Sequence, residues 1–127
     1  MMRTVAIMLA FLGVSACLAA DAPEVPLKSG AYEFKWKDAE FPSSDGFPVR
    51  VEIADKRVRI INEQKHRGVP VGEIGDGELM WHAKSSQWIL GHTEKDKVAP
   101  SVGGCDDADP FVVDFQKRVI WTCLWGP

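Results

Sequence analysis

At 127 residues, the chain has room for one domain. Its formal net charge is −3 and its largest basic cluster is "KHR" at 65–67, so we expect neither nucleic acid nor anionic lipid headgroups as an electrostatic partner. The 3 cysteines form an odd set, which would be awkward for an exported protein unless one of them has a separate role.

The N-terminal residues have the pattern of an export signal. Arg3 gives a positive start, residues 5–14 form an unbroken apolar run, and the small residues Ser15 and Ala16 follow. The run is too short to cross a bilayer, which needs about 20 apolar residues in a helix. We therefore interpret this segment as a secretory signal peptide.

The four residues Val14-Ser15-Ala16-Cys17 resemble a bacterial lipobox. The resemblance implies that residues 1–16 are a lipoprotein signal peptide and that Cys17 receives the lipid and becomes the mature N-terminus. It also implies a membrane partner, reached through the lipid and not through a spanning helix. Because Leu18 and not an aspartate follows the cysteine, the implied location in the bacterial envelope is the outer membrane, facing the periplasm or the exterior. The alternative is ordinary cleavage near residues 16–20, which would leave Cys17 incidental or removed.

The two remaining cysteines are expected to form a disulfide. With Cys17 acylated, Cys105 and Cys123 are left as a pair in an oxidising compartment, where disulfides persist. The connection at 93–109 lacks a persuasive strand or helix and is long enough to need restraint in a compact domain. We therefore predict that the stretch "VGGCDDADP" at 102–110 is chiefly a staple.

Residues 17–29 contain prolines and little periodicity, so we expect an extended tether. Residues 30–127 lack a 3.6-residue period and contain short runs of Val, Ile, Phe and Trp between Gly, Asp, Ser and Pro. This pattern is typical of an all-β domain. We predict a single small antiparallel β-barrel or sandwich of about eight short strands with one disulfide. Two of these strands are expected near 31–36 and 69–74, the second ending at a turn over Gly75–Gly77.

Three hairpins can be assigned a register. A turn at Asp55-Lys56 pairs Ile53 with Val58 and Glu52 with Arg59, which leaves one buried and one charged face. A turn at Ser85-Ser86 pairs Trp81 with Leu90 and Ala83 with Trp88. A turn at 116–117 gives a third hairpin with two largely apolar faces, which suggests a doubly covered pair. The faces of the second and third hairpins are as follows: Leu79, Trp81, Ala83, Trp88 and Leu90 on the buried face of the second; Phe111, Val113, Phe115 and Ile120 on one face of the third, and Val112, Val119, Trp121, Cys123 and Trp125 on the other.

The histidines do not point to a metal or catalytic centre. The second hairpin places His82 on its exposed face and His92 at the end of its buried face, on opposite sides of the sheet. His66 lies in a polar loop, and we interpret all three as unrelated surface histidines. The chain has no serine elbow, H-E-x-x-H, phosphate loop or C-x-x-C motif. We therefore expect no enzyme activity, no cofactor and no metal.

The aspartates at 106–109 suggest a calcium site. Asp107 and Asp109 are spaced like the start of an EF-hand loop, but Val112 and Arg118 stand where that loop needs a glycine and a glutamate. An EF-hand is excluded, whereas weak binding of calcium by Asp106, Asp107 and Asp109 stays open. Aspartate and proline are also ordinary loop residues.

We predict a non-catalytic module that binds or inhibits a protein. Small anchored β-barrels that inhibit lysozymes are similar in architecture alone, because their signature motifs are not evident here. The expected contact residues lie in two loops and are Ser43, Ser44, Asp45, Asp106, Asp107 and Asp109. One alternative is a carrier of a small apolar ligand with a lipocalin-like shape, although we expect the 5 tryptophans chiefly to fill the core. A second alternative is a hydrolase.

Overall fold

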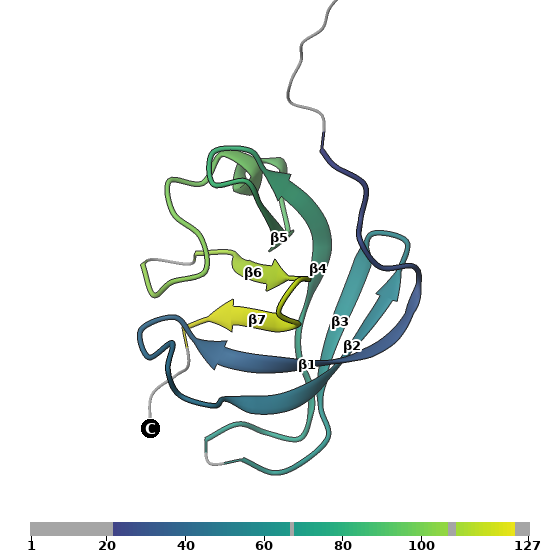
Figure 1. Ribbon diagram of the computed structural model, residues 1–127, viewed down its shortest axis with the longest axis vertical. Helices are drawn as coiled ribbons and strands as arrows, with labels where there is room; N and C mark the ends of the chain where they lie inside the picture. Colours follow the sequence, from purple (N-terminus) through teal and green to yellow (C-terminus); the bar gives the residue numbers. More distant parts are fainter. Residues whose placement is uncertain (1–21, 67, 107–108, 124–127) are drawn as a thin grey trace, which may run out of the picture.

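The computed structural model describes residues 22–66, 68–106 and 109–123. The signal peptide, Cys17, Asp107 and Trp125 lie outside the described residues. Figure 1 shows strands curving around a common interior, with residues 99–106 and 109–110, together called the 99–110 segment below, lying against one side. The elements are β1 (Gly30–Asp38), β2 (Phe47–Ala54), β3 (Arg57–Asn62), β4 (Gly72–His82), β5 (Gln87–Gly91), the 3₁₀ helix η1 (Glu94–Val98), β6 (Phe111–Asp114) and β7 (Val119–Thr122).

The strands close into a barrel in chain order, which confirms the all-β prediction. Each consecutive pair is antiparallel, and β1 pairs with β7 in parallel. The parallel closure follows from the strand number. When seven strands alternate in direction, the first and the last point the same way, so the barrel can close only through a parallel ladder.

The number of strands is seven and not about eight, because the turn expected at Gly75–Gly77 is the middle of β4. A Cβ atom on Gly75 would lie 3.2 Å from the Phe111 ring and 3.3 Å from Ile60. The register of the β3–β4 ladder shifts at the same level, between Ile60 and Ile61. The glycines therefore permit close packing at an irregularity in a long strand. Within a sheet, a glycine can mark such a close approach as well as a turn.

The hairpin registers are correct in two cases and displaced in one. Ile53 pairs with Val58 as predicted, and Val113 pairs with Ile120, which is the register that a turn at 116–117 requires. In the β4–β5 hairpin, Trp81 pairs with Trp88 and not with Leu90. The turn there comprises the four residues 83–86, so the predicted two-residue turn was wrong, and Ala83 is exposed instead of buried. A displacement of two residues leaves each side chain on its predicted face.

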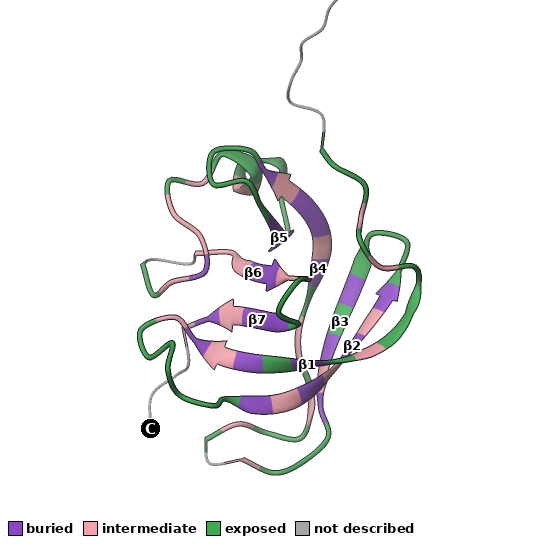
Figure 2. Cartoon of the chain, in the orientation of Figure 1, coloured by how far each residue is buried: buried purple, intermediate pink, exposed green. Residues whose placement is uncertain are grey.

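Figure 2 shows buried residues along every strand of the barrel. Most of them belong to two apolar clusters that stabilise the fold. The inner cluster fills the barrel with side chains from β1–β7, including the fully buried Phe34, Ile60 and Ile120. The outer cluster comprises Met80, Ile89 and Val112, with Val102 and Trp121 packed against it. Because Val102 belongs to the 99–110 segment, this segment covers the outer face of β4–β7. The third hairpin is therefore covered on both faces, as predicted.

The N-terminal part of the described chain also contacts the barrel. Val25 and Leu27 pack against the inner cluster, and the Ser29 hydroxyl oxygen accepts a hydrogen bond from the Asp55 backbone N–H at 2.8 Å. The packed part of the domain thus begins several residues before β1. Among the described residues, no helix has the length and apolar character that crossing a membrane would require.

Candidate functional site

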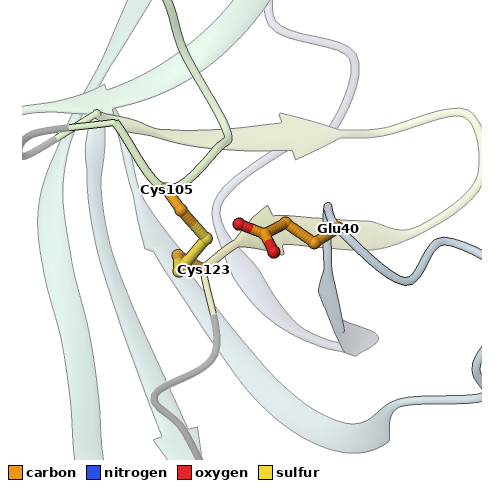
Figure 3. A group of neighbouring side chains, drawn as sticks. All are labelled: Glu40, Cys105 and Cys123. Carbon is orange, nitrogen blue, oxygen red and sulfur yellow. A yellow bond between two sulfur atoms is a disulfide. The ribbon is translucent and has the colours of Figure 1, made fainter.

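The candidate site is formed where two loops meet beside the disulfide. The first is the 39–46 loop between β1 and β2, and the second is the 99–110 segment before β6. Figure 3 shows Glu40 of the first loop directed toward the bonded Cys105 and Cys123. A Glu40 carboxylate oxygen and both sulfur atoms lie within 4.8 Å of one another. Glu40 is therefore a neighbour of Cys105 and Cys123, which follow it by 65 and 83 positions in the chain.

The disulfide is present as predicted. The Cα atoms of Cys105 and Cys123 are 4.8 Å apart and the two residues are separated by 18 positions. Cys105 is exposed and Cys123 is half-buried. Because β7 ends at Thr122, the bond ties the residue that follows β7 to the segment that covers the outer cluster.

Two polar contacts within the 99–110 segment join its first half to its last two residues. The Gly103 N–H donates to the Pro110 carbonyl at 2.7 Å, and the Ser101 hydroxyl donates to the Asp109 carboxylate at 2.7 Å. Gly103 has a φ of +76°, and a Cβ atom there would lie 2.9 Å from Val112. A side chain at this position would therefore meet both backbone strain and a steric clash.

His82 provides a further contact for this segment, and its predicted exposure was wrong. The side chain is 1% exposed, although it lies on the outer face of β4. Its Nε2 lies 2.8 Å from the Ala99 carbonyl oxygen, and its Nδ1 lies 2.7 Å from the Ser85 hydroxyl. Since a carbonyl only accepts, Nε2 carries the proton and donates to Ala99, which leaves Nδ1 to accept from Ser85.

The other two histidines also differ from the prediction. His92, expected at the end of the buried face, has a side chain that is 67% exposed, and its Nε2 lies 2.7 Å from the Asp76 carbonyl oxygen. His66 is half-buried, and its ring stacks on Phe47 with a centroid distance of 4.2 Å. The three histidines are thus separate, as expected, but only His92 is a surface residue.

The 39–46 loop is ordered by its own backbone. The Phe41 N–H donates to the Asp38 carbonyl at 3.0 Å, and the Phe41 carbonyl accepts from the Ser44 N–H at 3.0 Å. The Asp38 carboxylate, which is nearly buried, accepts from the Glu40 N–H at 2.8 Å. Two successive turns therefore fix the backbone on both sides of Phe41.

The predicted contact residues lie at the surface, but the aspartates do not form a cluster of ligands. Ser43, Ser44, Asp45 and Asp106 are exposed, and Asp109 is half-buried against Ser101. Within the described ranges, the single group of three or more possible metal ligands is Glu40 with the two cysteines. Asp107 lies outside these ranges, so the calcium hypothesis stays a prediction.

Two residues of this site were missed from the sequence. Phe41 is 63% exposed, which is unusual for a large aromatic side chain, and Glu40 faces the disulfide. A signal for Phe41 was present, since it stands alone in a turn-rich segment without a neighbouring strand pattern. The position of Glu40 depends on the β1–β7 closure, for which the sequence offers no local signal.

Comparison of the chain with protein-family models, with curated proteins and with solved structures finds no match in any of the three.

Proposed function

We propose that this protein is a bacterial envelope lipoprotein that binds, and in doing so can inhibit, a protein partner without catalysing a reaction. In this proposal a lipid on Cys17 anchors the chain to the outer membrane. The barrel then presents the 39–46 loop to the partner. The resemblance of Val14-Ser15-Ala16-Cys17 to a lipobox supports the anchor.

The exposure of Phe41 is the observation that carries the binding proposal. Its side chain is 63% exposed in the first half of the 39–46 loop. Aromatic residues are enriched in the buried cores of protein interfaces, where one anchor in a pocket supplies much of the affinity. Ser43 and Ser44 beside it offer hydroxyl groups for the polar rim of such an interface.

The order of this loop favours binding. Hydrogen bonds on both sides of Phe41 hold its backbone in the free protein. A partner would therefore not have to order the loop, and the conformational entropy lost on association would be small. A mobile loop of the same composition would bind less tightly.

The charge of the two loops defines the kind of partner surface. Residues 39–46 and 99–110 contain five aspartates and glutamates and no lysine or arginine. A complementary partner has positive charge around an apolar pocket that accepts the Phe41 ring. Such complementarity raises the association rate, and this gain in rate falls as salt is added.

The binding proposal is tested by affinity capture from envelope extract and from host secretions. Wild-type protein is compared with Phe41→Ala and with Val98→Ala, which truncates another exposed apolar side chain, 76% exposed and on η1. We expect wild type and Val98→Ala to capture the same protein and Phe41→Ala to lose it. Equal capture by both variants, or capture of nothing by the wild type, would refute the role of the loop.

The anchor is tested separately by labelling cells with an alkyne fatty acid. The wild-type chain should carry the label and partition into detergent, and Cys17→Ser should do neither. Recovery of an unlabelled mature chain starting near Ala20 would contradict the anchor but leave the binding proposal intact.

A small-ligand carrier is the second candidate, and an aromatic cluster at one end of the barrel favours it. Trp36 stacks on Phe47, which in turn stacks on His66. The Trp36 Nε1 and His66 Nε2 atoms are both buried and have no hydrogen-bond partner among the described residues, and Trp36 as a whole is only 4% exposed. Buried donors normally have a partner, so a bound group that accepts hydrogen bonds would complete this cluster. Native mass spectrometry of the protein from its host should then detect a small molecule that Trp36→Phe no longer retains.

A further inference from the structure

The disulfide lies beside a third possible metal ligand, the carboxylate of Glu40. One carboxylate oxygen and two sulfur atoms, brought from the β1–β2 loop, the 99–110 segment and the end of β7, lie within 4.8 Å of one another (Figure 3). Thiolate and carboxylate are both ligands of Zn²⁺. In the disulfide the sulfur atoms are bonded to each other, so this set can hold a metal only after reduction.

We propose that the dithiol form of this protein binds one Zn²⁺ through the Sγ atoms of Cys105 and Cys123 and the carboxylate of Glu40. A dithiol reductant transfers two electrons and two protons to the S–S bond, giving two thiols while the reductant becomes a cyclic disulfide. Zn²⁺ then displaces one proton from each thiol and forms two Zn–S bonds. The disulfide and the zinc thiolate are thus alternative states of the same pair.

The distances suit this exchange. Tetrahedral Zn²⁺ with Zn–S bonds of about 2.3 Å holds two sulfurs roughly 3.8 Å apart. The Cα atoms of the two cysteines are 4.8 Å apart, so side-chain rotation alone can open the S–S contact to that separation. Glu40 is exposed and its carboxylate can move the short distance that a Zn–O bond requires.

The ligand set does not depend on the disulfide for its position. The Ala39 N–H donates to the Thr122 carbonyl at 2.9 Å, which holds the residue before Glu40 against the residue before Cys123. The Gly103 N–H donates to the Pro110 carbonyl at 2.7 Å, which shapes the turn that carries Cys105. Neither hydrogen bond involves a sulfur atom, so reduction of the S–S bond breaks neither of them directly.

The donor set favours zinc over calcium or magnesium, since two of its three ligands are soft thiolates. Three protein ligands leave a fourth tetrahedral position, as in open zinc sites. A pocket of about 170 Å³ adjoins both cysteines and is lined also by Gly104, Asp106 and Thr122. A water molecule in this pocket would complete the coordination.

The experiment titrates the reduced protein with Co²⁺, a spectroscopic substitute for Zn²⁺, and then displaces it with Zn²⁺. The full chain carries Cys17→Ser, so that all thiols belong to the pair. It is reduced with a phosphine, which unlike a dithiol does not compete for the metal as a thiolate, and the phosphine is removed before titration. We expect one Co²⁺ per chain with the near-ultraviolet absorption of thiolate ligation, and no such band in the disulfide form. Glu40→Gln should weaken binding at least tenfold, whereas Asp45→Asn, a matched change in the same loop, should leave the Kd within twofold.

Near-ultraviolet circular dichroism shows whether the reduced chain is folded. If reduction unfolds the protein, metal should restore the folded signal in the wild type and in Asp45→Asn but much less in Glu40→Gln. Equal affinities of Glu40→Gln and Asp45→Asn would show that any dithiol suffices and would overturn the site. Absence of a one-to-one thiolate complex in the wild type would overturn it as well. Neither result bears on capture of a partner through Phe41, so this inference and the proposed function fail independently.

Discussion

The β2–β3 and β4–β5 hairpins differ in what covers their outer faces. Along β2, residues buried in the barrel alternate with partly exposed ones, and the outward Arg50 and Glu52 form an ion pair in contact with water. Along β4 and β5, the outward Met80, His82 and Ile89 are as buried as their inward neighbours. The 99–110 segment causes the difference, because it lies over β4–β7 and leaves β2–β3 uncovered.

Whether two side chains share a face of a sheet and whether that face is covered are separate properties of a strand. Alternation reports which side chains share a face, and it is correct for both hairpins. It does not report whether a distant segment returns to cover the polar face. Mutations on the outer face should therefore be costly in β4–β5 and mild in β2–β3.

The largest effect is expected for Trp88→Ala, on the inner face of β5. The Trp88 side chain is 7% exposed and meets the rings of Trp81 and Phe115 edge to face. Truncation of a buried aromatic residue lowers the free energy of unfolding by about 3–5 kcal/mol. Urea denaturation measures it, with the exposed neighbour Gln87→Ala as a control expected to change the value by under about 0.5 kcal/mol. Similar losses in both variants would mean that β5 is not packed as described.

Removal of the disulfide should come next. Replacing Cys105 and Cys123 together by serine frees a closed loop with a separation of 18 residues. The chain-entropy model assigns about 3 kcal/mol to a loop of this length. Hydrogen exchange should rise in the 99–110 segment and along the outer cluster, whereas β2–β3 should keep its protection relative to global unfolding. Uniform deprotection of both hairpins would contradict a local role of the staple.

A smaller effect is expected for His82→Ala, on the outer face of β4. This change leaves the Ala99 carbonyl and the Ser85 hydroxyl without the imidazole that bonds both. Loss of a buried hydrogen-bonding partner costs about 1–3 kcal/mol. The exposed Lys84→Ala is the control, and thermal unfolding of both variants gives the comparison. If His82→Ala were as mild as Lys84→Ala, the cover over β4–β5 would not depend on its imidazole contact.

What the sequence predicts correctly in this protein is local. The β2–β3 register follows from a two-residue turn, in which Asp55 adopts a φ of +58°. The disulfide follows from cysteine arithmetic and from a long connection without structure of its own. The turn at 83–86 has four residues, and neither it nor the strand through Gly75 has a distinguishing composition, so both were misread.

The features that the sequence does not predict depend on contacts between distant segments. Burial of His82 requires the 99–110 segment to return to β4, and the position of Glu40 requires β1 to pair with β7. No residue near His82 or Glu40 in the chain indicates either contact. The candidate site was therefore predicted at its two loops and at its disulfide, but not at the residues that join them.

The smallest effect is expected for Arg59→Ala, on the uncovered face of β3. Arg59 donates to Glu73 at 2.6 Å and to Glu52 at 2.9 Å, and its side chain is 57% exposed. The hydrogen bond to Glu73, and then the negative charges of Glu73 and Glu52, raise the pKa of the Arg59 guanidinium above its ordinary value. A raised pKa stabilises the folded state wherever the guanidinium is protonated, and that contribution is lost only as the pH rises through the range where arginine titrates.

The melting temperature of Arg59→Ala should therefore fall by less than that of His82→Ala, by the same small amount between about pH 5 and pH 9. Surface ion pairs are screened by salt, with a Debye length of about 3 Å at roughly 1 M, so the difference from wild type should nearly vanish there. The His82→Ala deficit should persist at the same ionic strength, because its hydrogen bonds are buried. A salt-insensitive loss for Arg59→Ala, equal to that of His82→Ala, would mean that a segment also covers the outer face of β2–β3 and that the two hairpins do not differ in the way described.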